Sequence, residues 1–138
     1  MKAMFDGENS IPAAQPCADG YPSVWLQLQV RRLNHLPTFA AAIPSVIAHA
    51  KAFPGMVRFG FDIDWERGRF RTFGAFDTRT SLQAYITDGA HGVVYRRLRG
   101  RLGEVSVNYG TLPVTALPAT WDEIPHSRFA KDPTTHAK

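Results

Sequence analysis

The histidine at position 91 carries the strongest chemical signal in the sequence. Asp88 lies three residues before it and Tyr95 lies four residues after it, and residues at these spacings are neighbours on one face of a helix. A neutral imidazole there could take a proton from a phenol or an enol, while Tyr95 could supply a hydroxyl. The same spacing also fits a histidine at the edge of the core that is bonded to Asp88. His91 and Tyr95 are therefore the catalytic candidates, and a purely structural role for His91 stays open.

A second group of residues could line an apolar pocket beside this histidine. These residues lie on the predicted helix that carries His91 and on alternating positions of two predicted strands. Aromatic side chains at such positions are more often part of a filled core than of a ligand site, so both alternatives stay open. The candidate substrate-binding residues are Leu26, Leu28, Phe59, Phe61, Trp65, Tyr85 and Val94.

Other chemical signatures in the sequence are weaker. Asp62, Asp64 and Glu66 alternate along one strand and could hold a hard cation, but the neighbouring arginines favour ion pairs across a hairpin. The other histidines lack the spacing of zinc ligands, and no glycine-rich phosphate loop, G-x-S-x-G elbow or H-E-x-x-H pair occurs. We therefore expect no metal site and no nucleotide cofactor.

Composition bounds the class of protein. The 138 residues include 44% hydrophobic and 20% charged residues and a single cysteine, Cys17, which fits one globular domain without an internal disulfide in a reducing cytoplasm. The net charge of +4 comes partly from the basic stretch 96–101. This stretch could bind nucleic acid, but the C-terminus of a helix is the better interpretation because cations there face the negative end of the helix dipole. We expect neither a nucleic-acid partner nor a membrane partner.

The elements that must position these residues follow the order strand, helix, strand, strand, helix, strand. This order predicts an α+β, ferredoxin-like βαββαβ fold, with a four-stranded antiparallel sheet and two helices on one face. Pro44, inside the first predicted helix, should kink that helix or mark a new start. The predicted strands cover residues 24–30, 56–65, 70–76 and 105–109, and the predicted helices cover residues 34–53 and 77–102.

Two flanking segments differ in composition from this domain, which we place at residues 23–112. Residues 1–22 lack periodicity and predict a flexible N-terminal arm. Residues 113–138 contain four prolines and predict an extended C-terminal segment, with a short strand near residues 114–117. This segment is long enough to reach a partner subunit.

The sheet face opposite the helices is expected to carry large apolar side chains. Trp25, Met56, and Phe73 or Phe76 are the candidates for that face. An uncovered face of this kind would be a large apolar patch, and two-fold pairing with a second copy is the commonest way to cover one. The sequence therefore predicts a homodimer with the sheets back to back.

The sequence resembles the dimeric α+β barrel superfamily and, within it, the antibiotic-biosynthesis monooxygenase-like proteins. The resemblance rests on the strand at residues 24–31, the link FPGMV at residues 53–57, the stretch FGAFDTRTSLQAY at residues 73–85, and His91. It covers about residues 23–112 and supports the fold more strongly than the activity. The superfamily includes cofactor-free quinone-forming oxygenases, haem-degrading enzymes, isomerases, cyclases and proteins with no known activity.

The resemblance implies a small cofactor-free monooxygenase acting on an aromatic or polyketide-like apolar substrate. The substrate enolate would itself reduce oxygen, and the protein would supply deprotonation, orientation and a dry cavity. The alternatives are a non-catalytic, ligand-binding or stress-related dimer, and a cyclase or isomerase that uses the same pocket. A haem-degrading activity is disfavoured, because the third predicted strand has no tryptophan and the first has no asparagine.

Overall fold

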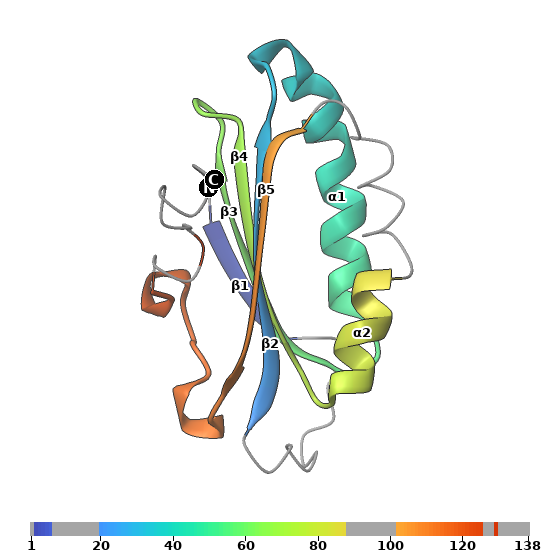
Figure 1. The fold of residues 1–138 in the computed structure, drawn as a ribbon, viewed down its shortest axis with the longest axis vertical. Coiled ribbons are helices and arrows are strands. Elements are labelled where there is room, and N and C mark those ends of the chain that lie inside the picture. Colours follow the sequence, from blue (N-terminus) through green and yellow to red (C-terminus); the bar gives the residue numbers. More distant parts are fainter. Residues whose placement is uncertain (1, 7–19, 88–101, 126–128, 130–138) are drawn as a thin grey trace, which may run out of the picture.

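The structure is a computed structural model that describes residues 2–6, 20–87, 102–125 and 129 (Figure 1). These residues form five strands and two α-helices, with three short 3-10 turns. The strands are β1 (Lys2–Asp6), β2 (Tyr21–Val30), β3 (Met56–Asp64), β4 (Arg69–Phe76) and β5 (Leu102–Leu112). The helices are α1 (Leu36–Ala52) and α2 (Arg79–Thr87), and the turns are η1 (Leu33–His35), η2 (Val114–Ala116) and η3 (Trp121–Glu123).

The strands form a single antiparallel sheet in the order β1-β3-β4-β2-β5. The order β2-α1-β3-β4-α2-β5 along the chain is the predicted ferredoxin-like arrangement, so the predicted fold class is confirmed. The sheet has five strands rather than four, because Lys2–Asp6 adds an edge strand beside β3. We had predicted a flexible arm there. The short strand is held by Phe5, whose ring stacks on Phe59 at 5.0 Å between centroids, and this long-range contact leaves no periodic signal in five residues.

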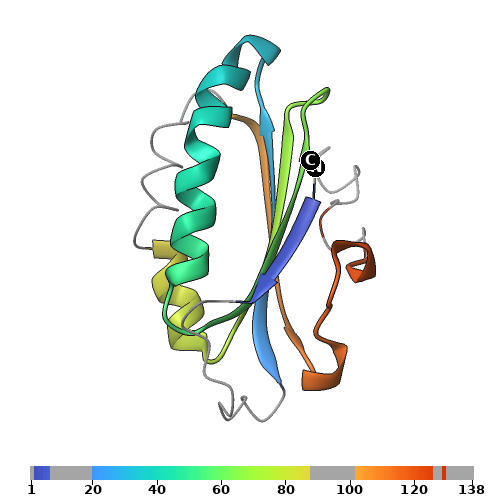
Figure 2. The same ribbon diagram turned by 180° about the vertical axis from the view of Figure 1, so that it is seen from behind.

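The sheet lies between two unlike layers. Figure 1 shows α1 and α2 on one face, here called the helix face, and the C-terminal segment on the opposite face, here called the back face. Figure 2 shows the same three layers from behind. The larger hydrophobic core lies under the helices, and a smaller one lies under the C-terminal segment.

The β3–β4 hairpin follows its sequence signals closely. Gly68 has a φ of 63° in the turn, a conformation that favours glycine. The carboxylate of Asp64 accepts from Arg67 at 2.8 Å and lies 3.5 Å from Arg69 across the hairpin. The predicted ion pairing of this acidic strand is therefore confirmed at Asp64.

Helix α1 packs its apolar side on the sheet. Pro37 lies in its first turn, where the missing N–H costs nothing. Pro44 is exposed inside the helix, and α1 continues through it to Ala52. The helix buries Phe39, Ile43 and Val46 among other residues of the larger core.

The C-terminal segment folds back over the sheet of its own chain. Residues 114–116 form a 3-10 turn, so the prediction of a short strand at 114–117 was wrong. Trp25 and Phe73 lie on the back face, as predicted. Met56 and Phe76 belong to the core under the helices instead. A register irregularity between Met56 and Arg58 shifts the alternation for Met56 at the start of β3, whereas Phe76 lies three residues after Phe73 on β4 and therefore faces the opposite side of the sheet. Among the helices that the structure describes, none is long and apolar enough to cross a membrane.

Candidate functional site

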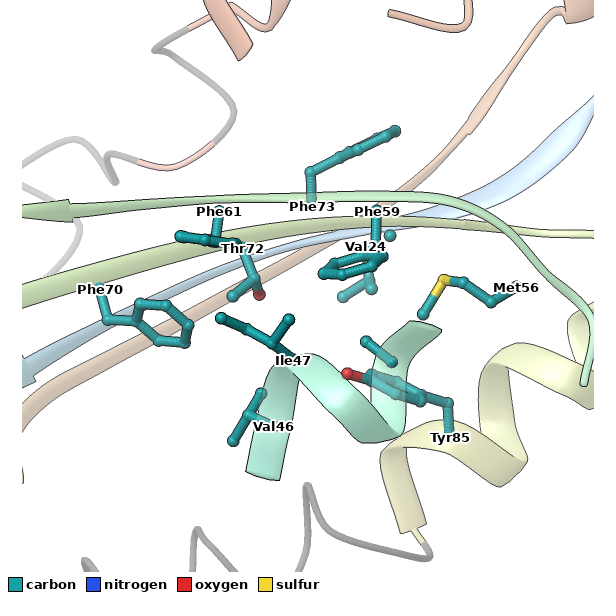
Figure 3. Close-up of a pocket in the computed structure, with 12 residues that line it drawn as sticks. Val24, Val46, Ile47, Met56, Phe59, Phe61, Phe70, Thr72, Phe73 and Tyr85 are labelled. Carbon is teal, nitrogen blue, oxygen red and sulfur yellow. The ribbon is translucent and has the colours of Figure 1, made fainter. Parts of the chain in front are cut away.

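A narrow cavity lies between the helix face of the sheet and the last turns of α1, beside α2 (Figure 3). It encloses about 20 Å³, which is room for about one water molecule. Most of its wall is apolar. The lining residues are Val24, Val46, Ile47, Ala50, Met56, Phe59, Phe61, Phe70, Thr72, Phe73, Gly74 and Tyr85.

The cavity depends on a glycine in the middle of β4. Gly74 lies in the wall of the cavity where a side chain would otherwise project from the sheet. A Cβ built there would lie 3.2 Å from the ring of Phe76 and 3.5 Å from the sulfur of Met56. Filling this position would therefore crowd the wall. Phe73, which precedes Gly74, is also a lining residue, but its ring points away from the other lining side chains, toward the back face (Figure 3).

Two hydroxyl groups interrupt the apolar wall. Tyr85 comes from α2 and Thr72 from β4, and Figure 3 shows the phenol oxygen of Tyr85 pointing into the ring of lining side chains. Burial raises the pKa of the Tyr85 phenol well above its usual value, so this group stays protonated at neutral pH. Tyr85 can therefore donate a hydrogen bond to a ligand oxygen, but it cannot act as a base.

Three rings hold Tyr85 in place. His49 stacks on it at 5.5 Å between centroids with an interplanar angle of 15°. Phe53 approaches its edge at 5.2 Å, and Phe76 lies 5.4 Å away. Aromatic pairs at these distances are mutually attractive. The phenol is therefore fixed by packing against both helix α1 and the end of β4.

His49 is a histidine whose importance the sequence did not reveal. It lies on α1 next to Ala50 of the cavity wall, and its Nδ1 is buried without a hydrogen-bond partner in the described part of the chain. Burial lowers the pKa of its imidazole, so the ring is neutral at pH 7. His49 therefore places a neutral imidazole against the protonated phenol of Tyr85, and Tyr85 is the member of this pair that lines the cavity.

The sequence-predicted site residues fall into three groups. Phe59, Phe61 and Tyr85 line the cavity. Leu26 and Leu28 are buried in the surrounding core but do not line it, and Trp65 is 41% exposed in the hairpin turn, outside the lining. The catalytic candidates His91 and Tyr95, together with Val94, lie outside the described residues.

Sequence reasoning missed Thr72 and His49. Thr72 belongs to a strand whose two faces are both apolar, so alternation did not single it out. His49 had a usable signal, since it falls between the buried residues Val46 and Ala50 and four residues before Phe53. His49 is itself half-buried, so this spacing marks it as a histidine at the edge of the core, as is common for this residue type.

Solved structures share this architecture at low sequence identity. A putative monooxygenase from Lactobacillus acidophilus superposes with a TM-score of 0.56 at 9% identity, over 68% of this chain and 45% of that chain. A putative monooxygenase from Fusobacterium nucleatum gives 0.62 at 10% identity, over 77% and 46%. A putative antibiotic biosynthesis monooxygenase from Nitrosomonas europaea gives 0.58 at 16% identity, over 67% and 91%.

The chain has the fold of the antibiotic-biosynthesis monooxygenase-like proteins. It spans less than half the length of the Lactobacillus and Fusobacterium proteins and most of the length of the Nitrosomonas protein. No family model and no curated protein matches the sequence. Because one fold supports many activities, the likeness establishes this architecture and leaves the chemistry to the residues of the site.

Proposed function

We propose that this protein binds an aromatic or polyketide-like apolar molecule in the cavity between the sheet and the helices and oxygenates it without a bound cofactor. The observation that carries this proposal is the apolar wall that only the hydroxyls of Tyr85 and Thr72 interrupt. Binding sites for small molecules are typically apolar with a few placed polar groups. The fold shared with proteins described as monooxygenases supports the oxygenase in particular.

In the proposed reaction the protein removes a proton from the substrate, and the substrate supplies the electrons that reduce oxygen. A bound phenol or enol loses its proton, and the resulting anion transfers electrons to molecular oxygen. One oxygen atom then forms a bond to a ring carbon, which loses its hydrogen, while the O–O bond breaks and the other oxygen atom leaves as water, so that a phenol or an anthrone becomes a quinone. His91 is the proposed base, with Tyr95 supplying a hydroxyl. Tyr85 would donate to the substrate oxygen and orient the ring.

The small size of the cavity favours one alternative function, a protein that binds apolar ligands without turnover. A space of about 20 Å³ is far smaller than an aromatic ring system, so a ligand must displace part of the wall. A protein that binds apolar ligands without turnover would need no more than this occasional opening. A cyclase or isomerase in the same cavity is the remaining alternative, and it would turn over its substrate without oxygen.

Oxygen uptake tests the proposal directly. We expect the protein to accelerate oxygen consumption by at least one member of a panel of polycyclic phenols and anthrones. Gly74→Ala should reduce that rate because it narrows the cavity, whereas Thr120→Ala, an exposed substitution in the C-terminal segment, should leave it unchanged. Saturable binding of panel members with no protein-dependent uptake would contradict the oxygenase and support the binding protein.

A further inference from the structure

One end of the molecule carries two exposed apolar side chains. Leu33 in η1 is 57% exposed, and Trp65 in the turn between β3 and β4 is 41% exposed. The start of α1 and the β3–β4 turn lie at the same end of the sheet (Figure 1). Among the described residues, Tyr109 on β5 is the remaining large hydrophobic side chain that is exposed. Single exposed apolar residues are normal, but two at one end of a fold indicate a contact surface.

The two loops that present these side chains are joined to each other. The backbone N–H of Val30, at the end of β2, donates to the carbonyl of Gly68 in the turn at 2.9 Å. A Cβ built on Gly68 would lie 3.5 Å from Cδ2 of Leu33, so Leu33 packs against this turn. The loops therefore form one preformed surface, here called the tip, which comprises residues 31–34 and 64–69.

The tip carries more positive than negative charge. Its charged residues are Arg31, Arg32, Arg67 and Arg69 and the acids Asp64 and Glu66. The carboxylate of Asp64 is shared by the two arginines of the hairpin, at 2.8 Å and 3.5 Å. Arg31 and Arg32 are exposed, and neither forms an ion pair within the described part of the chain. Two adjacent guanidinium groups are therefore available to an anionic partner.

The apolar and cationic groups together fit the surface of an anionic bilayer. The indole ring of a tryptophan such as Trp65 favours the headgroup region. The alkyl side chain of Leu33 gains free energy by leaving water for hydrocarbon. Arginine pairs with lipid phosphates and is attracted by the surface potential of anionic lipids. The tip thus combines the three kinds of group that a bilayer surface binds.

Two other anionic partners fit the tip less well. Single-stranded nucleic acid binds through rings on which its bases stack, and the alkyl group of Leu33 offers none. A protein partner would have to supply matched pockets for two protruding side chains, whereas a bilayer accommodates them without shape complementarity. A contact with a bilayer surface needs no membrane-spanning helix, although it departs from our expectation, based on the sequence, of no membrane partner.

We propose that the tip is a docking site for the surface of an anionic lipid bilayer. Leu33 and Trp65 enter the interface between headgroups and acyl chains, and Arg31 and Arg32 bind lipid phosphates. The cavity lies at the last turns of α1, whereas the tip lies beside the start of that helix, so docking leaves the cavity uncovered. Lipid binding can therefore be measured independently of ligand binding or turnover.

The fluorescence of the unaltered chain tests the proposal first. Of the three tryptophans, Trp25 and Trp121 are buried, so emission from water-exposed indole comes from Trp65. Vesicles of mixed phosphatidylcholine and phosphatidylglycerol should shift this emission to shorter wavelength in a saturable way, and brominated acyl chains should quench it. No saturable shift and no quenching would overturn the proposal. An equal shift with phosphatidylcholine alone would contradict the role of anionic lipid.

Co-sedimentation with the mixed vesicles measures how much each apolar side chain contributes. Leu33→Ser with Trp65→Ser should lower the partition coefficient by at least about tenfold, because both inserted groups are lost. Tyr109→Ser, which removes an exposed ring from β5, is the matched control and should leave it unchanged. These positions are exposed, so each variant should keep the native circular dichroism spectrum. Equal losses in the double variant and the control would show unspecific adsorption and overturn the docking site.

The arginines are tested one at a time. Arg31→Gln and Arg32→Gln should each lower the partition coefficient by about fivefold at low salt, and by less as salt screens the charges. Arg79→Gln, exposed at the start of α2 and beyond the far end of β4 from the tip, is the matched control. Unchanged partitioning in both tip variants would overturn the phosphate contacts. Binding of a single-stranded oligonucleotide or of polyglutamate that needs both arginines, with no vesicle binding, would overturn the lipid surface as the partner.

Discussion

The two faces of the sheet are covered in different ways. On the helix face, α1 and α2 each lie between two strands in chain order and pack on the sheet to form a core that includes Phe39, Phe70 and Phe76. On the back face, a segment with two 3-10 turns sits over Trp25 and Phe73. Both faces are covered, but only the layer of two helices follows from the ferredoxin-like order of elements.

The two cores differ in how many elements of the chain they need. The core under the helices needs every element between β2 and β5, so changes within it should act on the whole domain. The core under the C-terminal segment needs only one terminal piece, so changes there should act locally first. The cavity lies on the helix face, where its wall is held by the parts of the chain that define the fold.

The largest effect is expected from removing a ring on the helix face. Phe76 is fully buried and contacts Phe53 and Tyr85, and its replacement by alanine leaves a cavity that these rings cannot fill. We expect Phe76→Ala to lower the free energy of unfolding by about 3–5 kcal/mol. Urea denaturation followed by circular dichroism measures this loss, and a loss no greater than that of a surface substitution would contradict the central role of this core.

Removing a ring on the back face should cost the whole domain less. Trp121 is buried, but it belongs to the C-terminal segment, whose described residues after β5 pair with no strand of the sheet. We expect Trp121→Ala to lower the free energy of unfolding by about 1–3 kcal/mol and to release the segment before the sheet unfolds. Hydrogen exchange resolves the two steps. If Trp121→Ala and Phe76→Ala lower the free energy of unfolding by similar amounts, each in one cooperative transition, the distinction between the two faces is contradicted.

The two hydroxyls of the cavity should affect binding more than stability. Tyr85→Phe and Thr72→Val each remove an oxygen with little change of shape, and each should weaken binding of 1-naphthol by up to about tenfold, the equivalent of one hydrogen bond. Isothermal titration measures the dissociation constant. The matched control is Ser45→Ala, an exposed position on α1 outside the cavity lining. Unchanged affinity in both variants would place the ligand elsewhere.

The smallest effect is expected from the titration of His49. Its pKa is lowered by burial in the folded protein, so the unfolded chain binds a proton more readily. By linkage, its contribution to stability is present above the unfolded pKa of about 6.5 and is lost as pH falls through the folded pKa. The difference in unfolding free energy between the unaltered chain and His49→Gln should shrink as pH falls from 7 to 5. A difference that does not change with pH would show that His49 is not held neutral.

Strand alternation and the order of elements sufficed to predict the fold class. The pattern in β2 and β3 and the turn at Gly68 are local features that the sequence displays directly. The edge strand β1 and the cover of the back face were not predictable in this way, because contacts of Phe5 and Trp121 with distant residues decide them. Hydrophobic periodicity reports which side of an element is buried, but not which other segment buries it.

The candidate site was predictable only in part. Phe59, Phe61 and Tyr85 line the cavity and follow from alternation and helical spacing. Gly74 and Thr72 were not predictable. Gly74 borders the cavity because it has no side chain, and Thr72 contributes a hydroxyl to the wall. Neither property leaves a hydrophobic pattern in a single sequence. His49 acquires its significance from stacking on Tyr85, a contact between two helices.

The central claim is that the helix face binds the ligand while the back face is closed by the chain itself. A titration of the isotope-labelled full chain with 1-naphthol, followed by proton–nitrogen correlation spectra, tests both halves together. We predict saturable shifts at the amides of Val46, Ile47, Ala50, Thr72 and Tyr85 and none at Trp121 or Ile124. Shifts confined to Trp121 and Ile124, or no saturable shift at all, would contradict the claim.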